Sequence, residues 1–236
     1  MATTTTTTTT NDMSAQATSG VIPHWLKLKL NEKDLLRIRS SVMQAEKKTS
    51  GEIVPMVVRS SSSFGHVGLV LFLIGLVFFW TLATQVAHEV PTLPFWILEM
   101  SAVVLSMLLA WAFQSTDFAK YYLTSPHDQA LSVMHRAQLE FYQSNIKASH
   151  RQTGVLIFVS LLERRAVILA DETVSLKVPE QEWTNAINLL LKETKQGELA
   201  RGICDAIALV GQRLSESLPM HIGDRDELSN DLIMKD

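Results

Sequence analysis

The sequence predicts an α/β/α sandwich with a mixed sheet, interrupted by a two-helix transmembrane hairpin. Within the 236-residue chain, residues 60–88 and 100–116 contain no Asp, Glu, Lys or Arg. Helix-like and strand-like patterns precede these two stretches and follow them. Neither flank alone holds enough elements to bury a core, so we expect both flanks to build one domain.

Residues 1–20 predict a disordered tail. Thr3–Thr10 is an unbroken threonine run, and the rest of the segment is small and polar. Such a segment cannot bury enough apolar surface to offset the entropy of ordering it. It also lacks the basic and apolar regions of a secretory signal peptide.

The transmembrane hairpin is assigned to residues 64–116, with spans at about 67–87 and 93–113. A span needs about 20 mostly apolar residues, and both stretches are long enough. Glu99 lies about one turn inside the second span, where its carboxylate can reach water or lipid headgroups.

The short link at residues 88–92 has no Lys or Arg, whereas Lys47, Lys48 and Arg59 precede the first span. Lys120 and Arg136 follow the second. The positive-inside rule therefore predicts both flanks in the cytoplasm. We expect an integral membrane protein of the inner- or plasma-membrane type, with the lipid bilayer as one partner.

The first flank, residues 21–63, predicts one helix and one strand. The helix covers residues 32–49, with Asn31 as its N-cap. The strand covers residues 52–58. Its Pro55 has no N–H to donate, which predicts an edge strand or a bulge. The serines after Arg59 predict a flexible link into the first span.

The second flank, residues 117–236, predicts helices and two strands. Strand 154–161 is almost wholly apolar, which is typical of a strand covered on both faces. Only a few residues connect it to strand 166–171, too few for a parallel crossover, so the pair forms an antiparallel hairpin. The predicted helices cover residues 125–149, 179–196 and 198–218.

The strand of the first flank can lie parallel to strand 154–161, because the connection between them is long enough for a crossover. That connection passes through the membrane hairpin. A large insertion is tolerated there if its two ends stay near each other.

Four segments together resemble the TPM domain family: residues 48–54, 153–171, 178–183 and 223–228. The resemblance covers about residues 31–59 and 120–230. It implies an α/β/α sandwich. Some plant members, in the thylakoid lumen, are associated with acid phosphatase activity and photosystem repair. Others modulate receptors or are membrane-tethered domains without known chemistry.

This chain departs from the family pattern in three places. The hairpin lies inside the domain, whereas many members lack it or carry spans at one end. Ser229 stands where the family often has proline. Glu172 and Thr173 replace the more usual residue-Gly pair after Asp171.

Acidic residues are the candidate ligands for a hard cation such as Ca²⁺ or Mg²⁺. Asp171 is favoured because it ends an apolar strand, where α/β folds usually place ligands. The alternative is that these carboxylates are solvated or cap helices. The six candidates are Glu52, Asp171, Glu172, Asp224, Asp226 and Glu227.

A phosphatase also needs positive charge on the phosphoryl oxygens, and Arg164 and Arg165 could supply it beside Asp171. The alternative is a solvated turn. No Cys-x₅-Arg loop, Walker A run or Gly-x-Ser-x-Gly motif occurs. Cys204, the single cysteine, predicts a packed thiol and excludes an intramolecular disulfide. The net charge is −3, and the sequence has no cluster of basic residues that would predict a basic face. No nucleic-acid partner is therefore expected.

Three functions follow from these patterns. The first is a binding, assembly or quality-control module at the membrane surface, with another membrane protein as partner. The second is a metal-dependent, acid-phosphatase-like hydrolase. The third is ion transport through Glu99, which we disfavour because two helices are too few for a pore.

Overall fold

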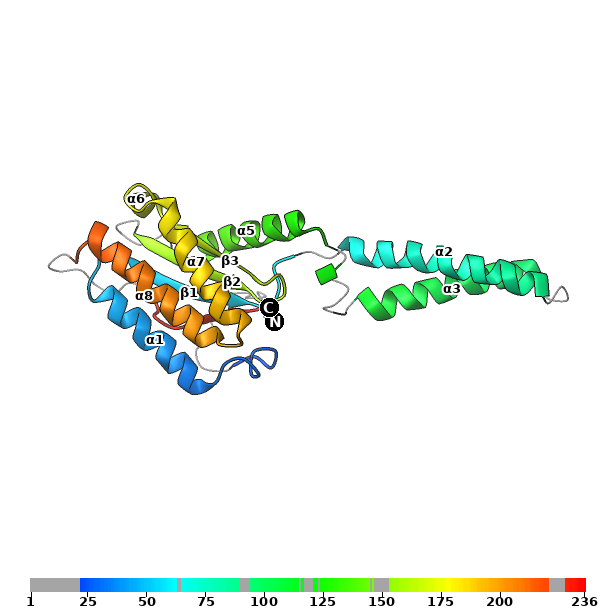
Figure 1. Ribbon diagram of the computed structural model, residues 1–236, viewed down its shortest axis with the longest axis horizontal. Coiled ribbons are helices and arrows are strands. Elements are labelled where there is room, and N and C mark those ends of the chain that lie inside the picture. Colours follow the sequence, from blue (N-terminus) through cyan, green and yellow to red (C-terminus); the bar gives the residue numbers. More distant parts are fainter. Residues whose placement is uncertain are drawn as a thin grey trace, which may run out of the picture.

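The computed structural model shows an α/β domain with a long helical hairpin projecting from one end (Figure 1). It describes residues 22–62, 65–89, 94–114, 116, 121–122, 124–144, 146, 153–220 and 228–236. The tail predicted at residues 1–20 therefore lies outside the described residues.

The domain is built on a four-stranded mixed sheet with the order β3-β2-β1-β4. β1 and β2 are parallel, and β2 and β3 are antiparallel, as the sequence predicted. β4 lies parallel to β1 and was not predicted, because three residues are too few for a periodic pattern. The strands are β1 (Glu52–Val58), β2 (Gly154–Ser160), β3 (Arg165–Ala170) and β4 (Ile233–Lys235).

Pro55 lies in an interior strand, so the prediction of an edge strand for β1 is wrong. The Glu52 N–H donates to the Thr153 carbonyl on the β2 side of the strand. N–H groups alternate along a strand, so the nitrogen of Pro55 faces the β4 side. Pairing with β4 begins only at Met56. The missing N–H therefore costs no ladder hydrogen bond.

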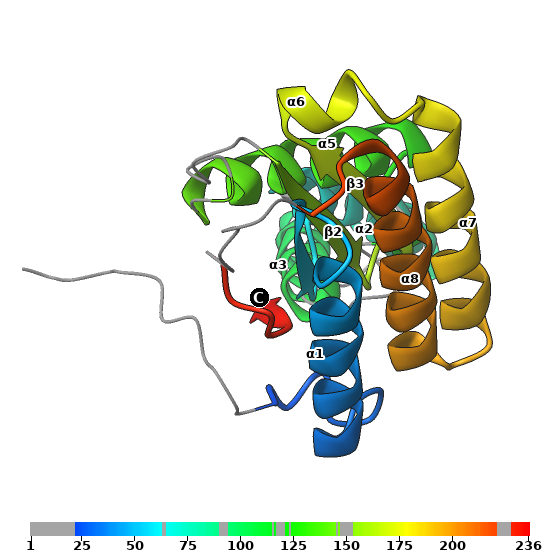
Figure 2. The same cartoon turned by 90° about the vertical axis from the view of Figure 1, so that its left-hand side faces the viewer.

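Helices cover both faces of the sheet, which confirms the predicted sandwich (Figure 2). α1, α7 and α8 pack with Ile53, Val57 and Ile157 on one face. α5 packs with Met56 and Phe158 on the other. The helices are α1 (Glu32–Glu46), α5 (Pro126–Gln143), α7 (Glu180–Lys195) and α8 (Leu199–Ser217).

Local signals set several helix ends. The Asn31 side chain accepts from the Asp34 N–H at 3.0 Å, and Asp34 reciprocates at 3.0 Å, so α1 begins with a capping box. α5 begins with Pro126 and ends at Gln143, earlier than the predicted residue 149. A single-turn helix, α6 (Glu172–Ser175), follows β3 and was not predicted.

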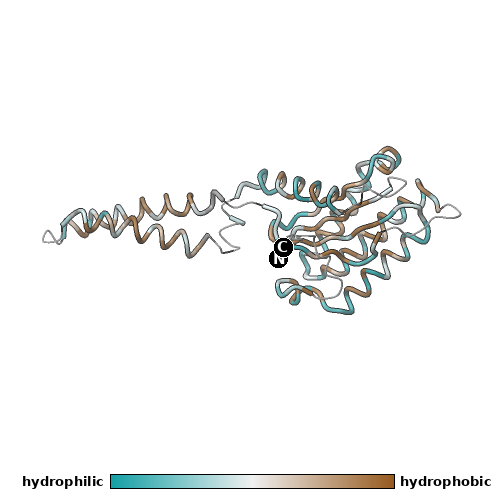
Figure 3. The backbone as a smooth tube through the Cα atoms, turned by 180° about the vertical axis from the view of Figure 1, so that it is seen from behind, coloured by the Kyte–Doolittle hydropathy of each residue, from teal (hydrophilic) through white to brown (hydrophobic). Residues whose placement is uncertain are grey.

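The hairpin consists of α2 (Gly65–Glu89) and α3 (Phe95–Gln114), and apolar residues run along both helices (Figure 3). Both are long and apolar enough to cross a membrane, and only 11% and 17% of their span residues are buried. A core helix would be mostly covered by protein, so these two helices are not part of the domain's core.

Small residues line the contact between α2 and α3. On α3, Ala102, Ser106 and Ala110 recur every fourth residue and are buried, whereas most of their neighbours are exposed. On α2, a Cβ added to Gly75 would lie 3.1 Å from the Ser106 Cβ. Small side chains on one stripe allow two backbones to approach closely, as in transmembrane helix pairs.

Candidate functional site

The candidate catalytic residues lie at opposite ends of the sheet. Arg165 is the first residue of β3, and Asp171 follows its last residue, Ala170. A strand rises about 3.3 Å per residue, so about 20 Å separates the two. Arg164 and Arg165 therefore cannot contact one phosphate together with Asp171, and the predicted catalytic set is not assembled.

Asp171 caps α6. It is only 4% exposed, and its Oδ1 accepts from the Glu172 N–H at 3.0 Å. Its backbone carbonyl accepts from the Val174 and Ser175 N–H groups. Its Oδ2 is buried and has no hydrogen-bond partner among the described residues. Capping therefore accounts for only one of the two carboxylate oxygens.

Glu52 and Asp171 flank Gly154 on the two neighbouring strands. Glu52 is in register with Gly154, and the Asp171 N–H donates to the Gly154 carbonyl at 2.9 Å. Two strand spacings of about 4.8 Å separate their backbones by about 10 Å. A Cβ on residue 154 would lie 2.6 Å from the Ile146 Cγ2, so only glycine fits at this position.

The remaining metal candidates do not complete a site within the described residues. Glu172 is exposed. Asp224, Asp226 and Glu227 lie outside the part of the chain that the structure describes. Within that part, no three Asp, Glu, His or Cys side chains converge as metal ligands.

Glu163, in the turn between β2 and β3, binds the chain that leaves β1 for the hairpin. Its side chain is 4% exposed. It accepts from the Ser60 hydroxyl at 3.2 Å, the Ser61 N–H at 3.1 Å and the Ser62 N–H at 2.9 Å. The Ser160 hydroxyl also donates to it. The serine segment predicted as a flexible link is thus held in place.

The next two residues bind the chain that returns from the hairpin. The Arg164 guanidinium lies 5.0 Å from the centre of the Tyr121 ring, within range of a cation–π interaction. Arg165 Nη2 donates to the Pro126 carbonyl at 3.0 Å. Arg164 has a φ of 52°, which is uncommon for a residue other than glycine.

The β2–β3 turn therefore contacts both chain segments that connect the domain to the hairpin. Leu161 and Leu162 strengthen this junction, because their N–H groups donate to the carbonyls of Val58 and Arg59. We call residues 161–165 the junction turn. Sequence reasoning missed Glu163, since a carboxylate between leucines and arginines in a short turn normally indicates a solvated loop.

No protein-family model and no curated protein matches the chain. A search of solved structures finds a similar fold in the NMR structure of the BA42 protein from the psychrophilic bacterium Bizionia argentinensis. The TM-score is 0.54 at 20% identity, over 87% of this chain and 94% of that chain. This likeness supports the fold and carries no information about function.

Proposed function

We propose that this protein is an integral membrane protein whose TPM-like domain is a binding, assembly or quality-control module at the membrane surface. The observation that carries the proposal is the junction turn. Its Glu163 accepts hydrogen bonds from the chain that enters the hairpin, and its arginines contact the chain that returns from it. Both connections would therefore keep the domain beside the membrane.

The surface of the hairpin supports membrane insertion. Large apolar side chains are widely exposed on both helices, among them Phe78 at 60%, Met107 at 67% and Trp111 at 71%. Water-exposed apolar surface of this extent is unfavourable, whereas lipid tails would cover it. Charge asymmetry across the spans supports a cytoplasmic domain.

Alkaline carbonate extraction of native membranes tests the anchoring. We expect the full chain to stay in the membrane pellet, as an integral protein does. Release into the supernatant would refute membrane insertion and leave a peripheral protein.

Cysteine labelling tests the orientation in a Cys204→Ser background. An impermeant maleimide added to intact cells should label Val90→Cys, between the spans, and should not label Lys192→Cys, which is exposed on α7. The reverse pattern would overturn the cytoplasmic assignment.

A pull-down from native membranes, followed by mass spectrometry, tests the module. We expect a reproducible membrane-protein partner. Recovery of no partner above an untagged control, from membranes solubilised in mild detergent, would contradict the module.

A metal-dependent, acid-phosphatase-like hydrolase is the second candidate, and the buried Oδ2 of Asp171 is the observation that favours it. Calorimetric titration with Ca²⁺ and Mg²⁺ tests it. The hydrolase predicts saturable binding that Asp171→Asn abolishes, together with phosphatase activity that the same change removes. Glu198→Gln, at an exposed carboxylate, is the control. Without metal binding or activity above background, this function is excluded.

A further inference from the structure

A pocket of about 320 Å³ lies beside the junction turn. β2 contributes Ser160, and the end of α7 contributes Thr194 and Lys195. The remaining described lining residues are Lys29, Val159, Leu161, Arg164, Arg165 and Leu191.

Four of these residues are basic, namely Lys29, Arg164, Arg165 and Lys195, and none of the described lining residues is acidic. Within the described residues, no ion pair joins any of the four to a carboxylate. The nearby Glu163 directs its carboxylate to the serine segment instead. The pocket therefore concentrates positive charge that the described part of the chain does not neutralise.

The pocket opens at the end of the domain that faces the hairpin. β1 leads into α2, and β2 runs parallel to β1, so the ends of both strands lie there (Figure 1). Only residues 63 and 64 separate the Ser62 bound by Glu163 from the start of α2 at Gly65. Three residue steps span at most about 10 Å, which is about one Debye length in physiological salt.

The length of α2 brings this end of the domain close to the bilayer surface. Its 25 residues span about 38 Å at 1.5 Å per residue, whereas the hydrocarbon core is about 30 Å thick. The excess places the helix start in the headgroup region. Positive charge at this depth attracts anionic lipids.

We infer that this basic pocket binds the phosphate group of an anionic phospholipid at the membrane surface. The inference rests on the proposed membrane anchoring. The exposed Lys29 and Lys195 supply charged N–H donors for the phosphate oxygens. Arg164 and Arg165 contact Tyr121 and Pro126 and add positive charge beside them. Free phosphate offers the same oxygens, so the experiment must separate the two sources.

Native mass spectrometry of the full chain in a neutral detergent tests the inference. The probes are phosphatidylglycerol, phosphatidylcholine of equal chain length, and inorganic phosphate. The pocket variant is Lys29→Gln with Lys195→Gln, because both lysines are exposed and neither is bonded to the returning chain. The arginines stay, since they contact Tyr121 and Pro126.

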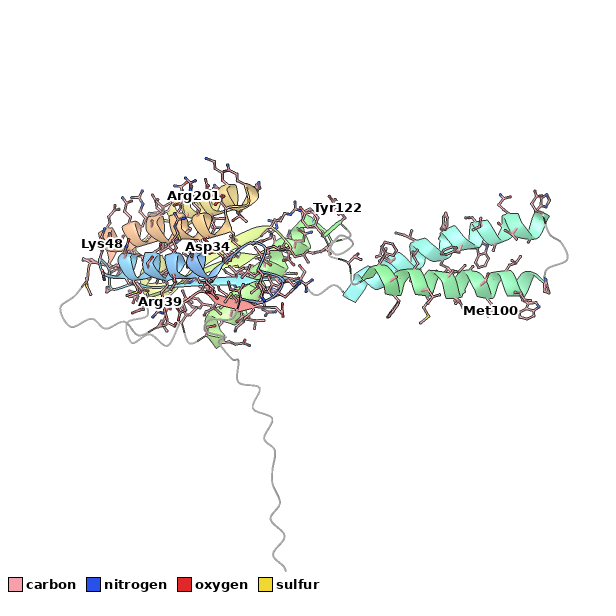
Figure 4. The ribbon with its side chains drawn as sticks, turned by 90° about the horizontal axis from the view of Figure 1, so that it is seen from below. Asp34, Arg39, Lys48, Met100, Tyr122 and Arg201 are labelled. Carbon is pink, nitrogen blue, oxygen red and sulfur yellow. The ribbon has the colours of Figure 1, made fainter. Side chains whose placement is uncertain are left out.

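The matched control is Lys47→Gln with Lys48→Gln, which removes the same charge at the end of α1. Figure 4 shows Lys48 at the end of the domain far from the hairpin. We expect phosphatidylglycerol affinity to fall about 25-fold in the pocket variant, about fivefold for each lysine near an anionic surface. The control should retain wild-type affinity.

Three results would overturn the inference. Equal losses in both variants would indicate a general charge effect. Equal affinity for phosphatidylcholine would indicate no phosphate-charge selectivity. Displacement of the lipid by equimolar inorganic phosphate would make free phosphate the ligand. All three results are measured in detergent, where lipid binding does not depend on membrane insertion. Carbonate extraction tests membrane insertion separately, so the failure of one proposal is distinguished from the failure of the other. Thermal unfolding confirms that both variants are folded.

Discussion

Glu163 is a buried carboxylate at the point where the sheet meets the hairpin. Its oxygens accept from two backbone N–H groups and two serine hydroxyls. Removing a buried acceptor leaves those donors unpaired, and this loss costs more than a typical surface contact is worth. Glu163 therefore holds Ser60–Ser62, the first residues of the connection from β1 to α2, against the β2–β3 turn.

The first prediction concerns this carboxylate. Glu163→Ala should destabilise the domain by about 3 kcal/mol, because several charge-assisted hydrogen bonds are lost together. It should also speed proteolysis at Ser60–Ser62. Thermal unfolding and limited proteolysis in detergent measure both. Glu163→Gln should be milder, and Glu198→Ala, at an exposed position, should have little effect. Unchanged proteolysis in Glu163→Ala would refute the role.

Cys204 is a second residue whose chemistry the packing sets. It is 7% exposed on α8, as its predicted packing requires. Burial raises the pKa of its thiol, and the Ser41 side-chain hydrogen bond partly offsets this rise. The thiolate, which is the reactive form, is therefore disfavoured in the folded protein.

The second prediction is slow alkylation of Cys204. Iodoacetamide should react with it much more slowly at pH 7 than with Lys192→Cys, which is exposed on α7. The raised pKa stabilises the folded state fully at pH values below the pKa of the thiol in the unfolded chain, about 8.5. This contribution is lost as the pH rises through the pKa of the thiol in the folded protein. Mass spectrometry follows the alkylation. Equal rates at the two cysteines would contradict the buried thiol.

At the scale of elements, the two hairpin helices pack through close approach of their backbones rather than through large apolar side chains. Lipid tails are as apolar as leucine, so burial from water does not drive two helices together in a bilayer. Gly75, Ser106 and Ala110 instead remove the bulk that would separate the backbones.

The third prediction compares one substitution at two positions on α3. Ala110 is 8% exposed, whereas Ala112 is exposed. Ala110→Leu should separate the helices and destabilise the hairpin by about 1–3 kcal/mol, as overpacking does. Ala112→Leu should face lipid with little effect. Thermal unfolding in detergent compares them, and equal losses of stability would mean that the small-residue stripe is not the contact.

At the scale of the molecule, the α/β domain is continuous in space but divided in sequence. β1 pairs with β2 along seven residues, although the whole hairpin lies between them. The junction turn contacts both connecting segments, so the ends of the insertion are already held near each other. We therefore expect the domain to fold without the hairpin.

The fourth prediction follows from that arrangement. Replacing residues 65–114 with a Gly/Ser linker of about ten residues should yield a folded domain that needs no detergent. Its unfolding should remain cooperative, and its melting temperature should lie within a few degrees of the full chain. Gel filtration and circular dichroism measure this. Aggregation of the shortened chain, with loss of the helical signal, would show that the hairpin is part of the fold.

Much of the architecture could be predicted from sequence because it depends on local patterns. Nearly unbroken apolar runs located the seven-residue β1 and β2, and the short connection after β2 required an antiparallel β3. β4 escaped prediction because three residues carry too little periodicity. The metal candidates were predicted by residue type alone, which cannot tell which carboxylates converge.

The sequence by itself determined the two apolar helices and the interrupted α/β domain, since hydrophobic composition is a local property. It allowed a parallel pairing of β1 with β2, and the tertiary structure shows that this pairing forms. Only the tertiary structure decided that Arg165 and Asp171 lie at opposite ends of the sheet. It also decided that Glu163 is buried against the serine segment, because burial and side-chain direction depend on residues about a hundred positions away.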